Sequence, residues 1–260
     1  MRRGAAANFV DEQLAHGRVC FSLPALTKAT GLSDTAASNQ LLRLGPLIRR
    51  ISPKFYLIVT PENRAMGAPP PEQWLDDYFC WLEHPYYLGL LSAAARHGSS
   101  PQAVQETEVI TDTPRRSIRC GRIRVDFFVK RKIAKSATQP LPGAFAPLLI
   151  STPEVTAFDL VRYAPRIGGF GRALETLRPL KDRIAVKELK ATLEAHDEVS
   201  TAQRLCFAFE KMGASRLADV VATSLPGRPQ PILLVSGSPR KKHTPVIKRW
   251  NLIDNSEGYL

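Results

Sequence analysis

Short polar side chains recur on one face of a helix that the sequence predicts over residues 34–44. That face holds Thr35, Ser38, Asn39 and Leu42, and the opposite, apolar face holds Ala37, Leu41 and Leu44. Asn pairs well with adenine, and Ser and Thr adapt to several base edges in the major groove of DNA. We therefore expect the polar side chains of this face, and the neighbouring Arg43, to contact the bases of a duplex.

Basic side chains follow this helix on two predicted strands, residues 47–51 and 55–59, which a turn over residues 52–54 joins. Arg49 and Arg50 lie on the first strand, and Lys54 lies in the turn. Cations on such a hairpin can meet phosphates, which supply affinity and register rather than sequence specificity. We expect these three side chains to contact the DNA backbone.

A shorter helix precedes the polar one. Ser22 is a good N-cap for a helix within residues 21–31, and Gly31 suits the left-handed residue just past its end. Ser33 can cap the second helix in the same way. Two helices joined by a tight turn and followed by a hairpin predict a winged helix-turn-helix domain over residues 1–60. The alternative is that the helices and hairpin serve protein docking or dimerisation.

The chain has 260 residues, with 36 Lys and Arg against 24 Asp and Glu, and a net charge of +12. An acidic partner is therefore the first candidate: nucleic acid, an anionic membrane or an acidic protein. The charge is uneven, because residues 1–60 carry 8 basic and 3 acidic side chains, residues 61–112 carry 2 and 8, and residues 113–135 carry 9 and 1. Two basic stretches flank an acidic one, which favours two separate interaction surfaces.

The second basic stretch lies on predicted strands at residues 108–111, 115–119 and 122–132, with a hairpin turn at Cys120-Gly121. Its cations are Arg115, Arg116, Arg119, Arg122, Arg124, Lys130, Arg131, Lys132 and Lys135. Charge on an exposed sheet can serve only to discourage edge pairing. Nine positive charges against one negative charge exceed that need. We therefore favour a binding surface for RNA, DNA or an acidic partner.

The Pro-rich residues 61–71 favour extended backbone and mark a domain boundary. Predicted later elements are helices over residues 72–83, 84–98, 186–196, 201–212 and 214–225, closing strands over 231–235 and 246–253, and a basic loop over 240–243. The predicted fold class is α+β. It comprises the N-terminal winged helix-turn-helix over residues 1–60, a linker over 61–71, and a larger mixed α/β domain over 72–260.

Three carboxylates could hold Mg²⁺ in a nuclease: Asp126, Glu154 and Asp159. Ser151 and Glu154 fit a capping box at a helix start, and Asp159 fits the surface of that helix, so neither carboxylate needs a catalytic role. His97 lies at a helix end, where it can contact the last carbonyls, and a catalytic role is the alternative. We expect no enzymatic activity, with a metal-dependent nuclease kept as an alternative hypothesis.

The remaining reactive side chains predict no metal site or cofactor. The cysteines are Cys20, Cys80, Cys120 and Cys206; they form no C-x-x-C pair, and the 5 histidines show no H-x-x-x-H spacing. No apolar run approaches the ~20 residues of a membrane span, and the first residues show no secretory signal. We therefore expect a cytoplasmic protein with reduced thiols and no membrane partner.

Four motifs extend along nearly the whole chain. They are residues 51–57 (ISPKFYL), residues 86–94 (YYLGLLSAA) followed by His97-Gly98, residues 150–160 (ISTPEVTAFDL), and Arg249-Trp250-Asn251. In order and spacing they resemble the AbiEi antitoxins of bacterial type IV toxin–antitoxin systems, which act in abortive infection, a form of phage defence.

The resemblance implies a two-domain antitoxin whose winged helix represses its operon by binding inverted repeats in promoter DNA. It also implies that the C-terminal domain counteracts a nucleotidyltransferase toxin encoded next door. The antitoxin need not form a stable complex with that toxin and could oppose it at its target, for which the family suggests RNA. The alternative is a plain transcriptional regulator whose second domain senses a ligand.

Overall fold

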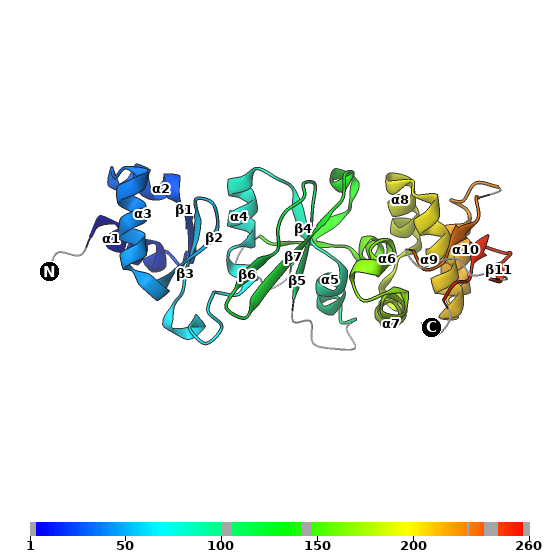
Figure 1. Ribbon diagram of the computed structural model, residues 1–260. Helices are drawn as coiled ribbons and strands as arrows, with labels where there is room; N and C mark the ends of the chain where they lie inside the picture. Colours follow the sequence, from blue (N-terminus) through cyan, green and yellow to red (C-terminus); the bar gives the residue numbers. More distant parts are fainter. Residues whose placement is uncertain (1–3, 100–105, 142–146, 228, 237–243, 257–260) are drawn as a thin grey trace. The chain divides into compact units, whose positions relative to one another are not determined.

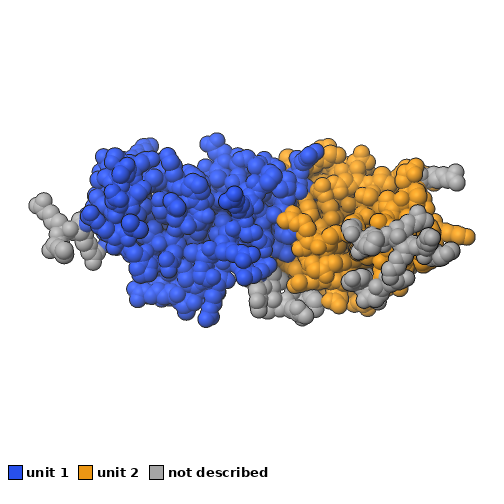
Figure 2. All heavy atoms as spheres, in the orientation of Figure 1, with its two compact units in different colours: residues 1–86, 105–131, 140–149 blue, residues 87–104, 132–139, 150–260 orange. Residues whose placement is uncertain are grey.

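The computed structural model describes residues 4–99, 106–141, 147–227, 229–236 and 244–256. Their contacts divide the chain into two compact units (Figure 2). Unit 1 comprises Met1–Tyr86, Gln105–Arg131 and Pro140–Leu149, and unit 2 comprises Tyr87–Val104, Lys132–Gln139 and Ile150–Leu260. Helices and sheets occur in both units, so the predicted α+β class is confirmed. The predicted basic loop at 240–243 lies outside the described residues.

Unit 1 begins with three helices and a small sheet (Figure 1). The order is α1 (Ala5–Ala15), β1 (Cys20–Ser22), α2 (Leu23–Thr30), α3 (Asp34–Arg43), β2 (Ile48–Ser52) and β3 (Phe55–Ile58). The strands pair antiparallel in the order β1-β3-β2. The sequence patterns predicted α2, α3 and the β2–β3 hairpin but not α1.

Local capping explains where α2 and α3 begin and end. The Ser22 hydroxyl accepts a hydrogen bond from the backbone N–H of Ala25 at 3.3 Å, and Ser33 does the same for Ala36 at 3.3 Å. Gly31 adopts the left-handed conformation with φ 70° after the last turn of α2. All three cap residues are those that the sequence predicted.

An aromatic core joins the three helices to the sheet. The rings of Phe9 and Phe21 lie 5.4 Å apart, and Phe21 stacks on Tyr56 at 5.5 Å. Leu26 of α2 and Leu41 of α3 are buried in the same cluster. Because every element contributes to one core, α3 and the β2–β3 hairpin are held in a defined relation.

The rest of unit 1 packs on the other face of this sheet. Here α4 (Leu75–Leu82) places Tyr78 and Trp81 against Phe55 of β3, with ring centroids 5.1 Å and 5.2 Å away. Three further strands follow, β5 (Thr107–Thr111), β6 (Ile118–Cys120) and β7 (Ile123–Val129). Phe79 of α4 contacts Phe127 of β7 at 6.0 Å. The aromatic residues of α4 therefore pack against both β3 and β7.

Residues 61–71, predicted as a linker, lie within unit 1 and pack closely on the β6–β7 turn. The Arg122 N–H donates to the Met66 carbonyl at 2.8 Å. A Cβ on Gly121 would lie 2.1 Å from that carbonyl oxygen and 2.7 Å from the Cα of Gly67. The two compact units therefore do not coincide with the predicted domains, residues 1–60 and 72–260. The assignment of separate functions to those two domains stays a prediction.

Unit 2 is mainly helical. Its helices are α5 (Leu90–Arg96), α6 (Pro153–Arg162), α7 (Phe170–Leu180), α8 (Val186–His196), α9 (Val199–Lys211) and α10 (Ser215–Ala222). A small sheet of β10 (Ile232–Leu233), β12 (Leu252–Ile253) and β11 (Val246–Ile247) follows, in the order β10-β12-β11. Three of the predicted helices correspond to α8, α9 and α10, and the strand predicted over residues 231–235 is present but shorter. The single strand predicted over residues 246–253 was wrong, because a turn divides it into β11 and β12, which pair antiparallel.

A six-stranded sheet has the order β6-β7-β5-β4-β9-β8, with β4 (Tyr86–Leu88), β9 (Leu149–Ser151) and β8 (Thr138–Pro140) as its last three strands. The prediction of one helix over residues 84–98 was therefore wrong at its start. Leu88 of β4 pairs in parallel with Ile150 of β9, and this distant partner converts the aromatic segment into a strand. The helix begins only after Gly89.

Candidate nucleic-acid interface

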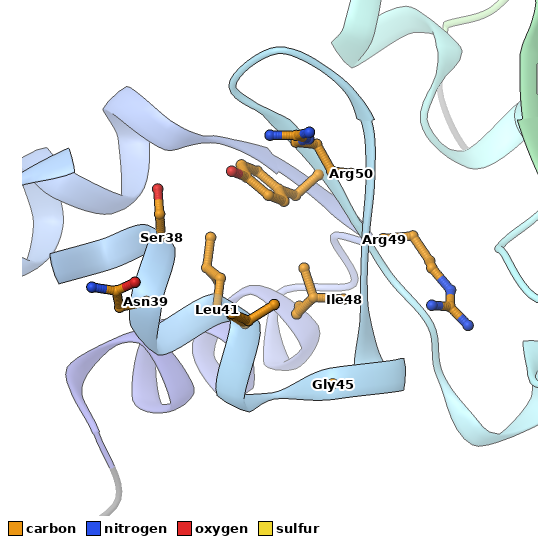
Figure 3. Close-up of a pocket in the computed structure, with 9 residues that line it drawn as sticks. Ser38, Asn39, Leu41, Gly45, Ile48, Arg49 and Arg50 are labelled. Carbon is orange, nitrogen blue, oxygen red and sulfur yellow. The ribbon is translucent and has the colours of Figure 1, made fainter. Parts of the chain in front are cut away.

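A groove of about 610 Å³ lies between α3 and the edge strand β2 (Figure 3). Its floor is apolar and consists of the buried side chains of Leu41, Ile48 and Tyr56. Its rim on the helix side consists of Ser38, Asn39 and Leu42, and its rim on the strand side includes Arg50. No acidic residue lines this groove within the described part of the chain.

The face of α3 that the sequence predicted to contact bases is open to solvent. Thr35, Asn39 and Arg43 are exposed, and Ser38 is half-buried. Ala37 and Leu41, on the opposite face, are 0% and 3% exposed. The helical spacing therefore separated the apolar face from the polar face correctly, whereas the contacts to DNA stay a prediction.

Arg49 and Arg50 point to opposite faces of β2. The sequence predicted the same role for both residues, contact with the DNA backbone, and did not predict this difference. Arg50 pairs with Tyr56 of β3, whose ring belongs to the core around α3, and Arg49 pairs with Leu57. Neighbouring residues of a strand alternate between faces. Accordingly, Figure 3 shows the Arg50 side chain on the side of α3 and the Arg49 side chain extending away from it. Both residues line the groove, but only the Arg50 side chain lies on the side of α3, and the contact of each residue with DNA stays a prediction.

Lys54 lies in the turn of the hairpin with φ 64°. Its Nζ atom is 3.2 Å from Oδ2 of Asp34, the first residue of α3, and both side chains are more than half exposed. Such an exposed pair contributes only about 0.2–1 kcal/mol. It nevertheless places the tip of the hairpin beside the N-terminus of α3, so a phosphate at this tip would compete with Asp34 for the lysine.

Gln40 helps to position α3, a role that the sequence did not predict. Its Oε1 atom accepts a hydrogen bond from the backbone N–H of Ala6 at 2.9 Å, which ties the start of α1 to α3. This contact joins residues far apart in the sequence, so no local pattern could reveal it. The effect is to hold α3 from the side opposite to its polar face.

The second predicted basic surface does not form one continuous patch. Lys130 is fully buried at 0% exposure, so its prediction as a surface residue was wrong. Arg115 is half-buried, with its guanidinium carbon 5.7 Å from the ring centroid of Phe79. Lys132 belongs to unit 2, where its Nζ donates to the carbonyl of His196 at 3.3 Å.

Four cations of this group remain exposed in unit 1 without a charged partner among the described residues: Arg116, Arg119, Arg122 and Arg131. Arg124 is also exposed, but it forms an ion pair with Glu106 at 2.8 Å. Arg119 and Arg124 stand directly opposite each other in the antiparallel β6–β7 pair and share a face. The strand prediction over 115–119 was partly wrong, because β6 begins only at Ile118.

The three candidate carboxylates do not meet. Asp126 accepts a hydrogen bond from Ser117, Glu154 Oε1 accepts from the N–H of Ala185 at 2.8 Å, and Asp159 Oδ2 accepts from the Tyr87 hydroxyl at 2.7 Å. Among the described residues, no group of three or more His, Cys, Asp or Glu side chains is placed to hold a metal ion. Each carboxylate therefore has a structural partner of its own. The prediction that Asp159 lies on the helix surface was wrong, because its side chain is buried at 0% exposure.

The predicted capping box at Ser151 was wrong. Thr152 is the N-cap of α6, because its hydroxyl accepts from the N–H of Val155 at 3.5 Å. The Glu154 side chain instead reaches the start of α8. His97 also differs from its prediction, since its Nε2 donates to the carbonyl of Ser151 at 2.8 Å rather than to the end of its own helix.

Two further observations concern the state of the cysteine thiols and the length and polarity of the helices. All four cysteines are free, and burial raises the pKa of the Cys206 thiol to about 12. Among the helices of the described residues, none is both long and apolar enough to cross a membrane.

These features define the class of protein: a mixed α+β chain with an exposed polar helix in unit 1 and a helical unit 2. Residues 87–210 match the family model described as the AbiEi antitoxin C-terminal domain. The chain therefore carries an AbiEi antitoxin domain, which confirms the resemblance to the AbiEi family and supports an antitoxin role in a toxin–antitoxin system. The matched residues include most of the second motif and all of the third.

The fold also has a match among solved structures. The crystal structure of the RV2827C protein from Mycobacterium tuberculosis superposes with a TM-score of 0.67 at 16% identity, covering 96% of this chain and 91% of that chain. At this identity the likeness concerns the fold alone. A comparison with curated protein sequences gave no match.

Proposed function

We propose that this protein is a type IV antitoxin that represses its own operon by binding promoter DNA through an N-terminal winged helix-turn-helix. Its C-terminal domain opposes a nucleotidyltransferase toxin. The observation that carries the DNA-binding proposal is the groove between α3 and β2, with Ser38 and Asn39 on one rim and Arg50 on the other.

The order of elements supports a winged helix. Two helices joined by a short turn, α2 and α3, are followed by the β2–β3 hairpin, which is the wing. A recognition helix lies in the major groove and presents the side chains of its exposed face to base edges. With α3 in the major groove and the wing beside it, one sugar–phosphate strand would run along the groove between them. An apolar floor suits deoxyribose, and the Arg50 guanidinium suits a phosphate.

The test is binding of the purified full-length protein to its own promoter fragment. The variant carrying Asn39→Ala and Arg50→Gln should bind at least about 30-fold more weakly, because a good base contact contributes about 1–3 kcal/mol and a phosphate contact is lost as well. Arg64→Gln is the control, since it removes the same charge from an exposed residue of unit 1 that does not line the groove. Equal losses in both variants would show that α3 and Arg50 do not form the contact surface.

For the antitoxin activity we propose that the exposed cations of unit 1, including Arg119 and Arg122, contact RNA that the toxin acts on. Their exposure and their lack of acidic partners within the described residues support this role. A stable complex with the toxin is not required. No catalytic step is proposed for this chain.

Co-expression with the neighbouring nucleotidyltransferase gene tests this second activity through rescue of growth. Replacing Arg119 and Arg122 by Gln should lower rescue, whereas the same change at the exposed Lys187 and Lys190 of α8 should not. Undiminished rescue by the arginine variant would remove these residues from the proposed RNA contact. Failure of the unaltered protein to rescue growth would contradict the antitoxin proposal itself.

A further inference from the structure

Leu42 is the most exposed large apolar side chain of the described residues. It is 80% exposed, compared with 41% for Met66 and 44% for Val246. It lies on α3, one helical turn after Ser38 and Asn39, and it lines the α3–β2 groove.

The fold does not explain a leucine at this position. The apolar contacts of α3 come from Ala37 and Leu41, which are buried, whereas Leu42 is not part of that core. Leucine favours the helical conformation, but lysine, arginine and glutamine favour it almost equally and would remain hydrated. An apolar side chain at the rim of the proposed DNA-binding groove therefore suggests an apolar partner group in the ligand.

We propose that Leu42 contacts the C5-methyl group of a thymine in the major groove and so selects a T·A pair at one operator position. This inference rests on the proposed DNA binding. Duplex DNA is the occupant that the surroundings favour, because Arg43 follows the residue on α3 and Arg49 and Arg50 line the same groove. No acidic side chain lines the groove among the described residues. The thymine methyl is the apolar group that the major groove displays.

The spacing on α3 also places the contacted thymine. Three residues of helix rise about 4.5 Å, and one base-pair step along a strand rises about 3.4 Å. Leu42 and Asn39 therefore reach adjacent or nearly adjacent base pairs. If Asn39 contacts an adenine, the thymine selected by Leu42 lies one or two steps away from it.

The experiment replaces each thymine of a footprinted half-site, one at a time, by deoxyuridine, which lacks only the methyl group. One position should weaken binding of the unaltered protein by about fourfold, corresponding to about 0.8 kcal/mol for one buried methyl-sized group. The same replacement should leave the affinity of Leu42→Ala unchanged. The salt dependence of binding should be equal for the two proteins, because no charge is altered.

Met66→Ala is the control, since it shortens another exposed apolar side chain of unit 1 that lies outside the groove. It should retain the fourfold response to deoxyuridine. The proposal is overturned if the unaltered protein binds its promoter but responds to no thymine replacement, or if Leu42→Ala responds equally. It is also overturned if Leu42→Ala changes only the oligomeric state, which would identify a second copy as the occupant. Absence of any promoter binding would instead refute the proposed function.

Discussion

Tyr86 and Tyr87 are neighbours in the sequence, but the carboxylates that their hydroxyls contact differ in burial. Tyr86 and Tyr87 are both buried, and each hydroxyl donates to a carboxylate at 2.7 Å. The partner of Tyr87 is Asp159, which is 0% exposed, whereas the partner of Tyr86 is the half-buried Asp76. Burial and the charge of Asp159 raise the pKa of Tyr87 well above its usual value, so this hydroxyl remains a donor.

Tyr87→Phe should therefore destabilise the protein more than Tyr86→Phe. Removing the hydroxyl of Tyr87 takes a donor from a carboxylate that water cannot reach, which costs about 1–3 kcal/mol. Water can replace the hydroxyl of Tyr86 at Asp76, so that change should cost less than about 1 kcal/mol. Urea midpoints of the two variants measure the difference. A lower midpoint for Tyr86→Phe than for Tyr87→Phe would contradict this account.

Cys206 makes the stability depend on alkaline pH. Burial raises its pKa to about 12 in the folded protein, whereas a cysteine in an unfolded chain ionises near pH ~8.5. The unfolded state therefore releases this proton first, and the stability that the neutral thiol contributes is lost as pH rises from about 8.5 toward 12. Between pH ~9 and ~11 the stability of the unaltered protein should fall more steeply than that of Cys206→Ala, by up to about 1.4 kcal/mol per pH unit. Parallel pH profiles of urea unfolding would refute this contribution.

At the scale of elements, residues 61–71 pack directly against the β6–β7 turn. Gly121→Ala should lower the urea midpoint strongly, because its Cβ would overlap the Met66 carbonyl oxygen at 2.1 Å and its φ is +59°. Gly213→Ala is the control, since it has a similar φ of +71° but no atom within 4 Å of an added Cβ. Gly213→Ala should lower the free energy of unfolding by only about 1–2 kcal/mol, which is the cost of a left-handed backbone at a residue with a Cβ. Equal losses would show that this close packing does not contribute to stability.

The sequence predicted those elements whose boundaries depend on near neighbours. Ser22 and Ser33 each cap a helix through an N–H three residues away, so the local pattern contained the whole interaction. The strand β4 was missed because Leu88 acquires a distant partner, Ile150, which no local pattern reveals. Tertiary packing likewise decides that Lys130 is buried.

The candidate interface was predictable to a similar degree. Helical periodicity identified the exposed face of α3, including Asn39 and Leu42. Alternation along a strand separates Arg49 from Arg50, but deciding which of them faces α3 required the pairing of β2 with Tyr56 and Leu57 of β3. The groove itself depends on how the hairpin and α3 share one core, which is a property of the folded chain.

At the scale of the whole molecule, we expect one chain to carry two separable activities. In our proposal, promoter binding belongs to the α3–β2 groove of unit 1, and antitoxin activity belongs to the region that matches the AbiEi domain, residues 87–210. The residues of the groove, such as Ser38, Asn39 and Arg50, lie outside that matched region. The two activities should therefore respond to different substitutions.

The most direct measurement follows promoter repression and toxin neutralisation in the same cells. The full-length variant Ser38→Ala, Asn39→Ala, Arg50→Gln is expressed with a reporter for the promoter and with the neighbouring toxin gene. We expect loss of repression with neutralisation unchanged, because the altered side chains line the groove and none lies in the buried core. Repression that survives the triple change, or neutralisation lost together with repression in a variant that remains folded, would contradict the account.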